Sequence, residues 1–447
     1  MQITFPRAVS PAFKAIVIGA IVIALLVPLS MLEGLVRERE VLREAAYVRV
    51  AEGWGGALKV GGPVLVVPTE TQSEPAESPR VDREDLYLLP TSLDIAIDTA
   101  QEPEPRYVGL YEVPVFTASI RITGAFDLAN VRRELEARHA DRRILWHQVR
   151  LRLPTSDPRG LRELSTARFG TEDLTFSPGA RGPFAGLESA IASDGLREDA
   201  MRQFEFGLRM GGSRELAVLP VGSTTGVSVR SDWPHPAFRG AYLPAERVVT
   251  PSGFEARWQI LELNRTYGSV LSSRTIDEAR IGDALICVGF HQPVDIYQRG
   301  ERAIKYALLF IALTFMTVFA WEHVTGMSLH PLQYLLVGFA LSIFYLLLIA
   351  LSEHLAFVYA YWIAATALVL LIGVYLAGAL RSPRRGWIAA AALLGTYAIS
   401  YFLIISESYA LLMGSIVLFA ALGIVMTTTR HVDWYATTRD RGPERGA

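Results

Sequence analysis

The sequence predicts an integral membrane protein: an α-helical bundle of six transmembrane helices with a large, β-rich, sandwich-like extracytoplasmic domain. Two observations predict this fold class. Long apolar runs occur near the N-terminus and after residue 303, and each approaches the roughly 20 residues that cross a hydrocarbon core. Charged residues concentrate between Glu33 and Arg302, where apolar and polar residues alternate as in half-buried strands.

Composition bounds the remaining possibilities. Charged residues make up 20% of the chain, which is too many for a protein that lies in the membrane throughout. The net charge is -2 and the two signs are interspersed, so a nucleic-acid partner is not expected. Cys287 is the sole cysteine, which excludes a disulfide within the chain and predicts a buried, unreactive thiol in an apolar strand.

The first apolar run, 12–32, predicts a transmembrane helix that follows a cytoplasmic segment, 1–11. It is longer than the apolar part of a typical signal peptide, and no Ala-x-Ala-like cleavage site follows it. We therefore expect an uncleaved anchor. The polar segment 33–56 predicts a juxtamembrane helix that continues from the anchor.

Five further spans complete the predicted bundle, 304–427, before a cytoplasmic tail, 428–447. Their predicted ranges are 304–321, 332–351, 356–380, 387–405 and 409–427. Arginines cluster at 381–385 and after residue 429, and such clusters stay on the cytoplasmic side. The chain is therefore predicted to be a multi-pass membrane protein with cytoplasmic N- and C-termini and the region 57–303 outside the cytoplasm, which in a Gram-negative cell is the periplasm.

Short alternating segments in 57–303 predict mainly antiparallel strands with one solvated face. They are 62–68, 93–98, 116–123, 149–154, 204–210 and 226–231. A helix is predicted at Leu128–His139, with Asp127 as its N-cap. The segment Gln72–Arg83 is rich in Glu and Pro and predicts an exposed loop.

Motifs of catalysis, metal binding or cofactor binding are absent from the sequence pattern, so we expect no enzyme, no metal and no cofactor. The densest rigid motif is Trp233-Pro-His-Pro-Ala-Phe238. Trp233, His235 and Phe238 could form a stacking platform for a sugar or peptide. The favoured interpretation is a proline-stiffened corner whose aromatic side chains fill the core.

Ionisable residues at span ends are candidates for a transport role: Glu353, His354 and Glu407. The favoured alternative is structural. Ser352 and Ser406 would cap the helices that follow them, and the adjacent glutamates would complement the helix dipole.

Several blocks resemble the CreD family of bacterial inner-membrane proteins, described as cell envelope integrity proteins. The resemblance covers nearly the whole chain and is most specific around His330. The blocks are Gly62–Pro68, Trp233–Pro236, Leu243–Arg247, Ser252–Phe254, Trp258, Arg302–Ala307, Ala312–Met316, Leu329–Gly338, Phe344–Leu348, Ala350–His354 and Val432–Tyr435.

The resemblance implies an inner-membrane protein under two-component control that affects tolerance to envelope-directed agents such as colicins and β-lactams. It supplies no catalytic residues. We expect a non-enzymatic protein that contacts the lipid bilayer and an unidentified envelope protein or glycan. Two other functions stay open: a transporter or flippase for an envelope precursor, and a periplasmic binding or sensing module coupled to the membrane.

Overall fold

The computed structural model describes most of the chain and divides it into two compact units. The described residues are 11–73, 80–102, 106–109, 111–138, 142–156, 158–179, 182, 184–192, 201–290, 296–325, 329–379, 382–406 and 409–429. One unit comprises Met1–Leu42 and Val294–Ala447 and is helical. The other comprises Arg43–Pro293 and is built mainly of strands.

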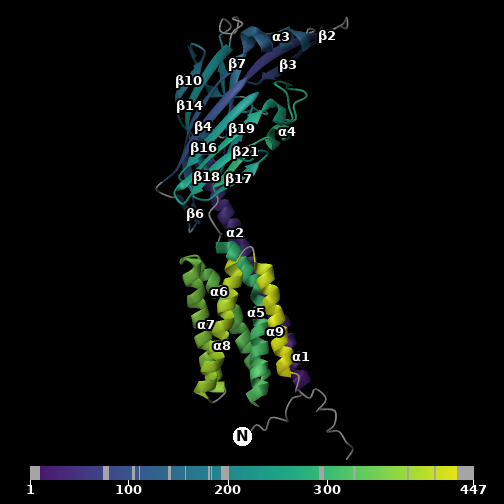
Figure 1. The fold of residues 1–447 in the computed structure, drawn as a ribbon, viewed down its shortest axis with the longest axis vertical. Coiled ribbons are helices and arrows are strands. Elements are labelled where there is room, and N and C mark those ends of the chain that lie inside the picture. Colours follow the sequence, from purple (N-terminus) through teal and green to yellow (C-terminus); the bar gives the residue numbers. More distant parts are fainter. Residues whose placement is uncertain are drawn as a thin grey trace, which may run out of the picture. The chain divides into compact units, whose positions relative to one another are not determined.

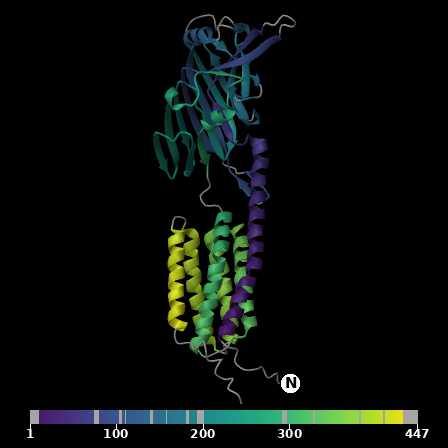
Figure 2. The same ribbon diagram turned by 90° about the vertical axis from the view of Figure 1, so that its right-hand side faces the viewer.

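Long helices form the first unit, and Figure 2 shows α5 to α9 running side by side as a bundle. The helices are α1 (Pro11–Ala24), α2 (Leu26–Trp54), α5 (Ile296–Thr325), α6 (Pro331–Ser352), α7 (Phe357–Ala379), α8 (Pro383–Ile405) and α9 (Ala410–Thr429). Helix α6 packs on α5 and α7, and α8 packs on α7. Only the first part of α2 belongs to this unit.

Four described helical segments are long and apolar enough to cross a membrane: Ile16–Val50, Pro331–Ser352, Phe357–Ala379 and Pro383–Ile405. Leu411–Ile424 is apolar but shorter over its described residues. Large apolar side chains point outward from these helices, as Leu371 and Phe419 illustrate. In water such a surface would be unfavourable, whereas lipid chains cover it without cost.

The N-terminal helix is interrupted at Leu25, inside the predicted span 12–32. Pro28 explains the position, because its ring clashes with the carbonyl of the residue four places earlier, Ala24. Leu25 is buried, and its side chain lies against Gly338 of α6, where an added Cβ would lie 2.5 Å from Leu25 Cδ1. The break is therefore packed into the bundle.

The second unit contains two large sheets and two small ones (Figure 1). The eight-stranded sheet has the order β11 (Glu172–Asp173), β10 (Leu161–Phe169), β14 (Met201–Ser213), β7 (Val115–Asp127), β4 (Ser92–Gln101), β16 (Thr224–Ser231), β19 (Gly253–Leu261) and β18 (Glu246–Thr250). The seven-stranded sheet has the order β12 (Ser177–Pro178), β13 (Gly186–Ala190), β9 (Arg150–Pro154), β2 (Val64–Ser73), β3 (Arg80–Leu88) and β20 (Val270–Ser272), with β8 (Arg143–Ile144) paired to β2.

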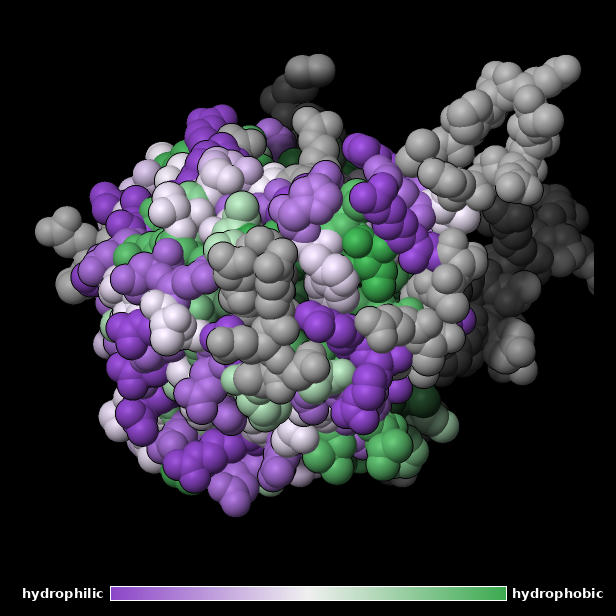
Figure 3. All heavy atoms as spheres, turned by 90° about the horizontal axis from the view of Figure 1, so that it is seen from above, coloured by the Kyte–Doolittle hydropathy of each residue, from purple (hydrophilic) through white to green (hydrophobic). Residues whose placement is uncertain are grey.

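The small sheets and short helices complete this unit. The four-stranded sheet has the order β1 (Leu58–Gly61), β15 (Glu215–Leu219), β21 (Ile286–Phe290) and β17 (Pro236–Gly240), and β5 (Arg106–Val108) pairs with β6 (Tyr111–Val113). The short helices are α3 (Leu128–Arg138) and α4 (Glu278–Asp283). Figure 3 shows one face of the protein from above, covered largely by hydrophilic residues with smaller hydrophobic patches.

A single hydrophobic core joins the inward faces of the two large sheets. Ile95 and Ile120 contribute from the eight-stranded sheet, and Leu65 and Leu151 from the seven-stranded sheet. Alternate residues of β4 are buried, as the period-two pattern predicted. The shared core is that of a sandwich, so the large β-rich domain that the sequence predicted is confirmed.

Two details differ from the sequence prediction. Most pairs are antiparallel, but β1 pairs with β15, and β4 with β16, in parallel. More than a hundred residues separate the partners along the chain, long enough for the crossover that parallel pairing requires. The loop predicted at Gln72–Arg83 is wrong at both ends, because Arg83 lies in β3 and contacts Glu70 of β2 at 2.9 Å.

The predicted helix after residue 127 is confirmed as α3, Leu128–Arg138. Oδ1 of Asp127 accepts a hydrogen bond from the backbone N–H of Asn130 at 3.0 Å. This is the contact expected of an N-cap, because the first turn of a helix leaves its N–H groups without helical partners.

Candidate functional site

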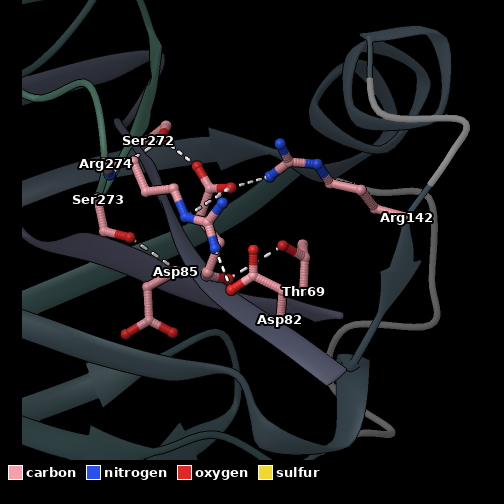
Figure 4. A network of polar contacts seen from close by, with 8 residues as sticks. Thr69, Asp82, Asp85, Arg142, Ser272, Ser273 and Arg274 are labelled. Carbon is pink, nitrogen blue, oxygen red and sulfur yellow. Dashed lines mark hydrogen bonds and ion pairs between the residues drawn. The ribbon is translucent and has the colours of Figure 1, made fainter. Parts of the chain in front are cut away.

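Glu84 of β3 is the centre of a polar network. Figure 4 labels its partners Arg142, Ser272 and Arg274. Its carboxylate accepts hydrogen bonds from the hydroxyl of Ser272 in β20 and from Nη1 of Arg142. Nε of Arg274 lies 3.8 Å away, and Arg274 also forms an ion pair with Asp82. One carboxylate, 5% exposed, therefore joins β3 to two segments that are distant in sequence.

These contacts determine the charge state of Glu84. Burial opposes ionisation, but the hydrogen bond from Ser272 and the cations of Arg142 and Arg274 hold the pKa of Glu84 below its usual value. A carboxylate that stays ionised and accepts several donors is poorly suited to general acid–base work at neutral pH. We interpret this network as a clamp within the fold.

A second network lies on the opposite face of β3, because Asp85 follows Glu84 in the strand. Arg150 of β9 lies 3.2 Å from Asp85 and 3.3 Å from Glu188 of β13. Arg152 is buried, and its Nε donates to Glu188 at 2.5 Å. Among the described residues, Nη1 of Arg152 has no hydrogen-bond partner. Four alternating charges thus connect β3, β9 and β13 of the seven-stranded sheet.

The aromatic motif considered as a stacking platform lies largely in the core. Trp233 is buried, and its indole N–H donates to the carbonyl of His235 at 3.1 Å. Its ring packs edge-on against Phe290, 6.2 Å between centroids. Phe238 is partly buried and packs against Trp258 at 5.9 Å. His235 itself is exposed. The structure thus places Trp233 away from solvent, where a ligand could not stack on it without rearrangement.

The polar residues at the span ends do not form one group. Oε1 of Glu353 lies 3.5 Å from Nε of Arg39 in α2. The next residue, His354, is exposed in the turn after α6. Glu407 lies outside the described residues. Sequence reasoning missed the Arg39–Glu353 contact, because more than three hundred residues separate the two positions.

The predicted capping role of Ser352 is wrong. Ser352 is the last residue of α6, and its hydroxyl donates back to the carbonyl of Leu348 at 2.5 Å. Helix α7 begins only at Phe357. Ser406 is likewise the C-terminal cap of α8. Both serines therefore close the preceding helix instead of opening the next one.

His330 caps α6, a role that sequence reasoning did not assign. Its Nδ1 accepts from the backbone N–H of Leu332 at 3.2 Å, and its own backbone N–H donates to Oε1 of Gln333 at 2.8 Å. Pro331 occupies the first turn, where a missing N–H costs no hydrogen bond. The signal was present as a polar residue, a proline and a glutamine immediately before an apolar run.

Buried hydroxyl groups lie between α6, α7 and α8. The hydroxyl of Tyr361 donates to the carbonyl of Tyr397 at 2.7 Å. Phe344 packs against both rings, with centroid distances of 5.6 and 4.7 Å. The hydroxyls of Tyr345 and Tyr397 are buried without a partner among the described residues. Polar groups of this kind are costly in an apolar interior.

Across the described residues, no group of three or more His, Cys, Asp or Glu side chains could hold a metal ion. The fold and these contacts define a class of protein: an integral membrane protein with an apolar helical unit and a large β-rich domain.

The chain belongs to the CreD family. The model of that family, Inner membrane protein CreD, matches residues 10–435. The chain is 33% identical to the inner membrane protein CreD of Escherichia coli (strain K12) over 434 residues, which cover 96% of this chain and 94% of that protein. The similarity inferred from the sequence blocks is therefore confirmed, and the protein is a member of a family of inner membrane proteins.

Proposed function

We propose that this protein is a non-enzymatic component of the bacterial inner membrane that contributes to cell envelope integrity and to the envelope stress response, under two-component control. Its family and its architecture support the proposal. An apolar helical unit anchors a β-rich domain, whose buried charges Glu84 and Arg152 serve the fold. The partner we propose is an envelope protein or glycan outside the membrane, beside the lipid bilayer itself.

The topology that we propose has six spans with both termini in the cytoplasm. Contacts at the two ends of α6 support the relative directions of the first and third spans in this topology. Nζ of Lys14 in α1 lies 5.7 Å from the ring centroid of Tyr334 in the first turn of α6. Arg39 of α2 contacts Glu353, just after the last turn. The N-terminal helices therefore run in the same direction as α6, as the first and third spans of an alternating bundle would.

The ion pair between Arg39 and Glu353 is the single observation that most favours a structural role over transport. A carboxylate that relays protons or binds a cationic substrate has to change its protonation or its partner during the cycle. Glu353 is 13% exposed and already has a cationic neighbour on another helix. We infer that it holds α2 against the end of α6.

A transporter or flippase is the second candidate, and the buried hydroxyls of Tyr345 and Tyr397 favour it, because a polar substrate in the membrane needs polar partners. A binding or sensing module is the third. It is favoured by α2, whose residues Leu26–Trp54 form one helix that contributes to both units.

Exchange of the two charges of the Arg39–Glu353 pair is an experiment that distinguishes a structural role from transport. In cells that lack their own CreD-family protein, Arg39→Glu combined with Glu353→Arg should restore tolerance to envelope-directed agents, because the attraction is re-formed. A transport carboxylate would not tolerate the exchange. Failure of the double variant at normal protein abundance would favour the transporter. Abundance in the membrane, measured by immunoblotting, keeps a folding defect distinct from a functional one.

A further inference from the structure

A cavity of about 540 Å³ lies on the outer face of the eight-stranded sheet. Its volume is in the range of roughly 300–1,000 Å³ that small-ligand sites occupy. The walls come from β7, β4, β16, β19, the first residue of β18 and the residue before it. Small residues form the middle of this face, since Ala96 is opposite Ser228 and Asp94 is opposite Gly226 in neighbouring strands.

Gly226 forms the floor of the cavity, and its missing side chain leaves the space that the carboxylate of Asp94 occupies. A Cβ added to Gly226 would lie 2.4 Å from Oδ1 of Asp94. The carboxylate of Asp94 therefore lies across the glycine, in space that a side chain would otherwise occupy. Replacement of Gly226 by alanine would displace that carboxylate and narrow the cavity.

Four charged residues line the cavity, and they differ in their partners. Arg257 and Glu246 are 3.7 Å apart and compensate each other. Asp94 and Arg121 are exposed, and within the described residues neither forms an ion pair. The cavity thus offers one anion and one cation that the protein leaves uncompensated.

The strand register fixes the spacing of the two strand positions that carry these charges. Asp94 pairs with Thr123 and Arg121 pairs with Ala96, so Asp94 and Arg121 are diagonal neighbours across β4 and β7. Diagonal neighbours in an antiparallel pair lie roughly 7–8 Å apart. Two extended residues span about 7 Å, so a dipeptide has the same length as the separation of these two strand positions.

We propose that this cavity binds a short zwitterionic peptide, with its ammonium group at Asp94 and its carboxylate at Arg121. The guanidinium group of an arginine suits a carboxylate because it presents two parallel donors. Thr123, Ser228 and Gln259 line the same cavity and supply hydrogen-bonding groups for peptide amides. The two charged residues and these hydrogen-bonding side chains favour a peptide over the acyl chain of a lipid. This inference goes beyond the proposed function and does not depend on it.

The test is ligand-observed saturation-transfer NMR on the full-length protein in nanodiscs, with glycylglycine as the probe. N-acetyl-glycylglycine lacks the ammonium group, and glycylglycinamide lacks the carboxylate. We expect each to bind about tenfold or more weakly than glycylglycine, because a charge-assisted hydrogen bond is lost. Equal binding of the blocked peptides would overturn the proposal.

Matched variants locate the site. Asp94→Asn, Arg121→Gln and Gly226→Ala should each weaken glycylglycine binding about tenfold or more. Arg230→Gln should leave it unchanged, since Arg230 lies on the same face but outside this cavity and contacts Asp98 and Glu255. Unchanged thermal unfolding shows that the variants remain folded. Equal binding by all four variants would place the peptide elsewhere.

Two further probes distinguish other occupants. Glycerophosphoethanolamine presents the zwitterion of a lipid headgroup, and N,N′-diacetylchitobiose presents an uncharged glycan. We expect glycylglycine to bind and neither of these probes to compete with it. Binding of either of them in place of the peptide, or no binding of glycylglycine up to 10 mM or so, would overturn the proposal.

Discussion

Nε of Arg39 in α2 lies 3.5 Å from Oε1 of Glu353, which immediately follows α6. The two side chains are 37% and 13% exposed, so the carboxylate is the more buried partner. This difference in exposure predicts which single substitution lowers the free energy of unfolding more. Removal of the arginine leaves a largely buried charge without this partner, whereas removal of the glutamate leaves a cation that reaches solvent.

We therefore expect Arg39→Gln to lower the free energy of unfolding by about 1–3 kcal/mol. Glu353→Gln should cost about 1 kcal/mol or less. The measurement is thermal unfolding of the protein in nanodiscs. Arg37→Gln is the matched control, because Arg37 pairs with Glu33 on the exposed surface of the same helix and should change little. The opposite order of the Arg39 and Glu353 variants would contradict a structural pair.

Glu84 predicts a pH dependence of stability. Its folded pKa is lowered, so its contribution is present above its unfolded pKa of about 4.3 and is lost as the pH falls through the folded pKa. Glu84→Gln should cost about 1–3 kcal/mol at neutral pH and should flatten this acid dependence. Urea unfolding followed by tryptophan fluorescence between pH 7 and pH 3 measures both effects.

Asp82→Asn is the control for Glu84. Asp82 also contacts Arg274, but its side chain is 52% exposed, so it should cost less than about 1 kcal/mol. If the free energy of unfolding of Glu84→Gln fell with pH as steeply as that of the unaltered protein, other carboxylates would be responsible for the pH dependence.

Cys287 should react slowly with maleimides. It is only half-buried, which corrects the prediction of a fully buried thiol. Burial and the neighbouring carboxylate of Glu215 nevertheless raise its pKa to about 11. The thiolate fraction near pH 7 falls about a hundredfold relative to a thiol of pKa 9.0. Glu215→Gln should speed labelling. Reaction of native protein as fast as of urea-unfolded protein would contradict this placement.

Reporter fusions test the proposed topology. Fusions after Arg385 and after Arg445 should report the cytoplasm, because both follow clusters of arginine. A fusion near Gly170, in the β-rich domain, should report the periplasm. A cytoplasmic signal near Gly170 would reverse the whole proposed orientation.

Sequence patterns predicted the elements whose signals are local. The alternation in β4 and the cap at Asp127 depend on neighbouring residues, and the structure has both. Contacts between distant segments were not predictable in this way. Glu84 contacts Ser272 across 188 positions, and the parallel pairing of β4 with β16 joins segments more than a hundred positions apart. Short turns were also misjudged: the sequence alone did not show that Ser352 closes α6 instead of opening α7.

The most direct test of the central claim, a structural rather than a transporting membrane protein, is complementation by Glu353→Gln combined with Glu407→Gln. Glutamine keeps an oxygen that accepts a hydrogen bond but cannot titrate, so a structural role survives and a proton relay does not. The measurement is survival of cells that lack their own CreD-family protein under a β-lactam or a colicin. We predict restored tolerance. Loss of tolerance at normal protein abundance would contradict the structural role.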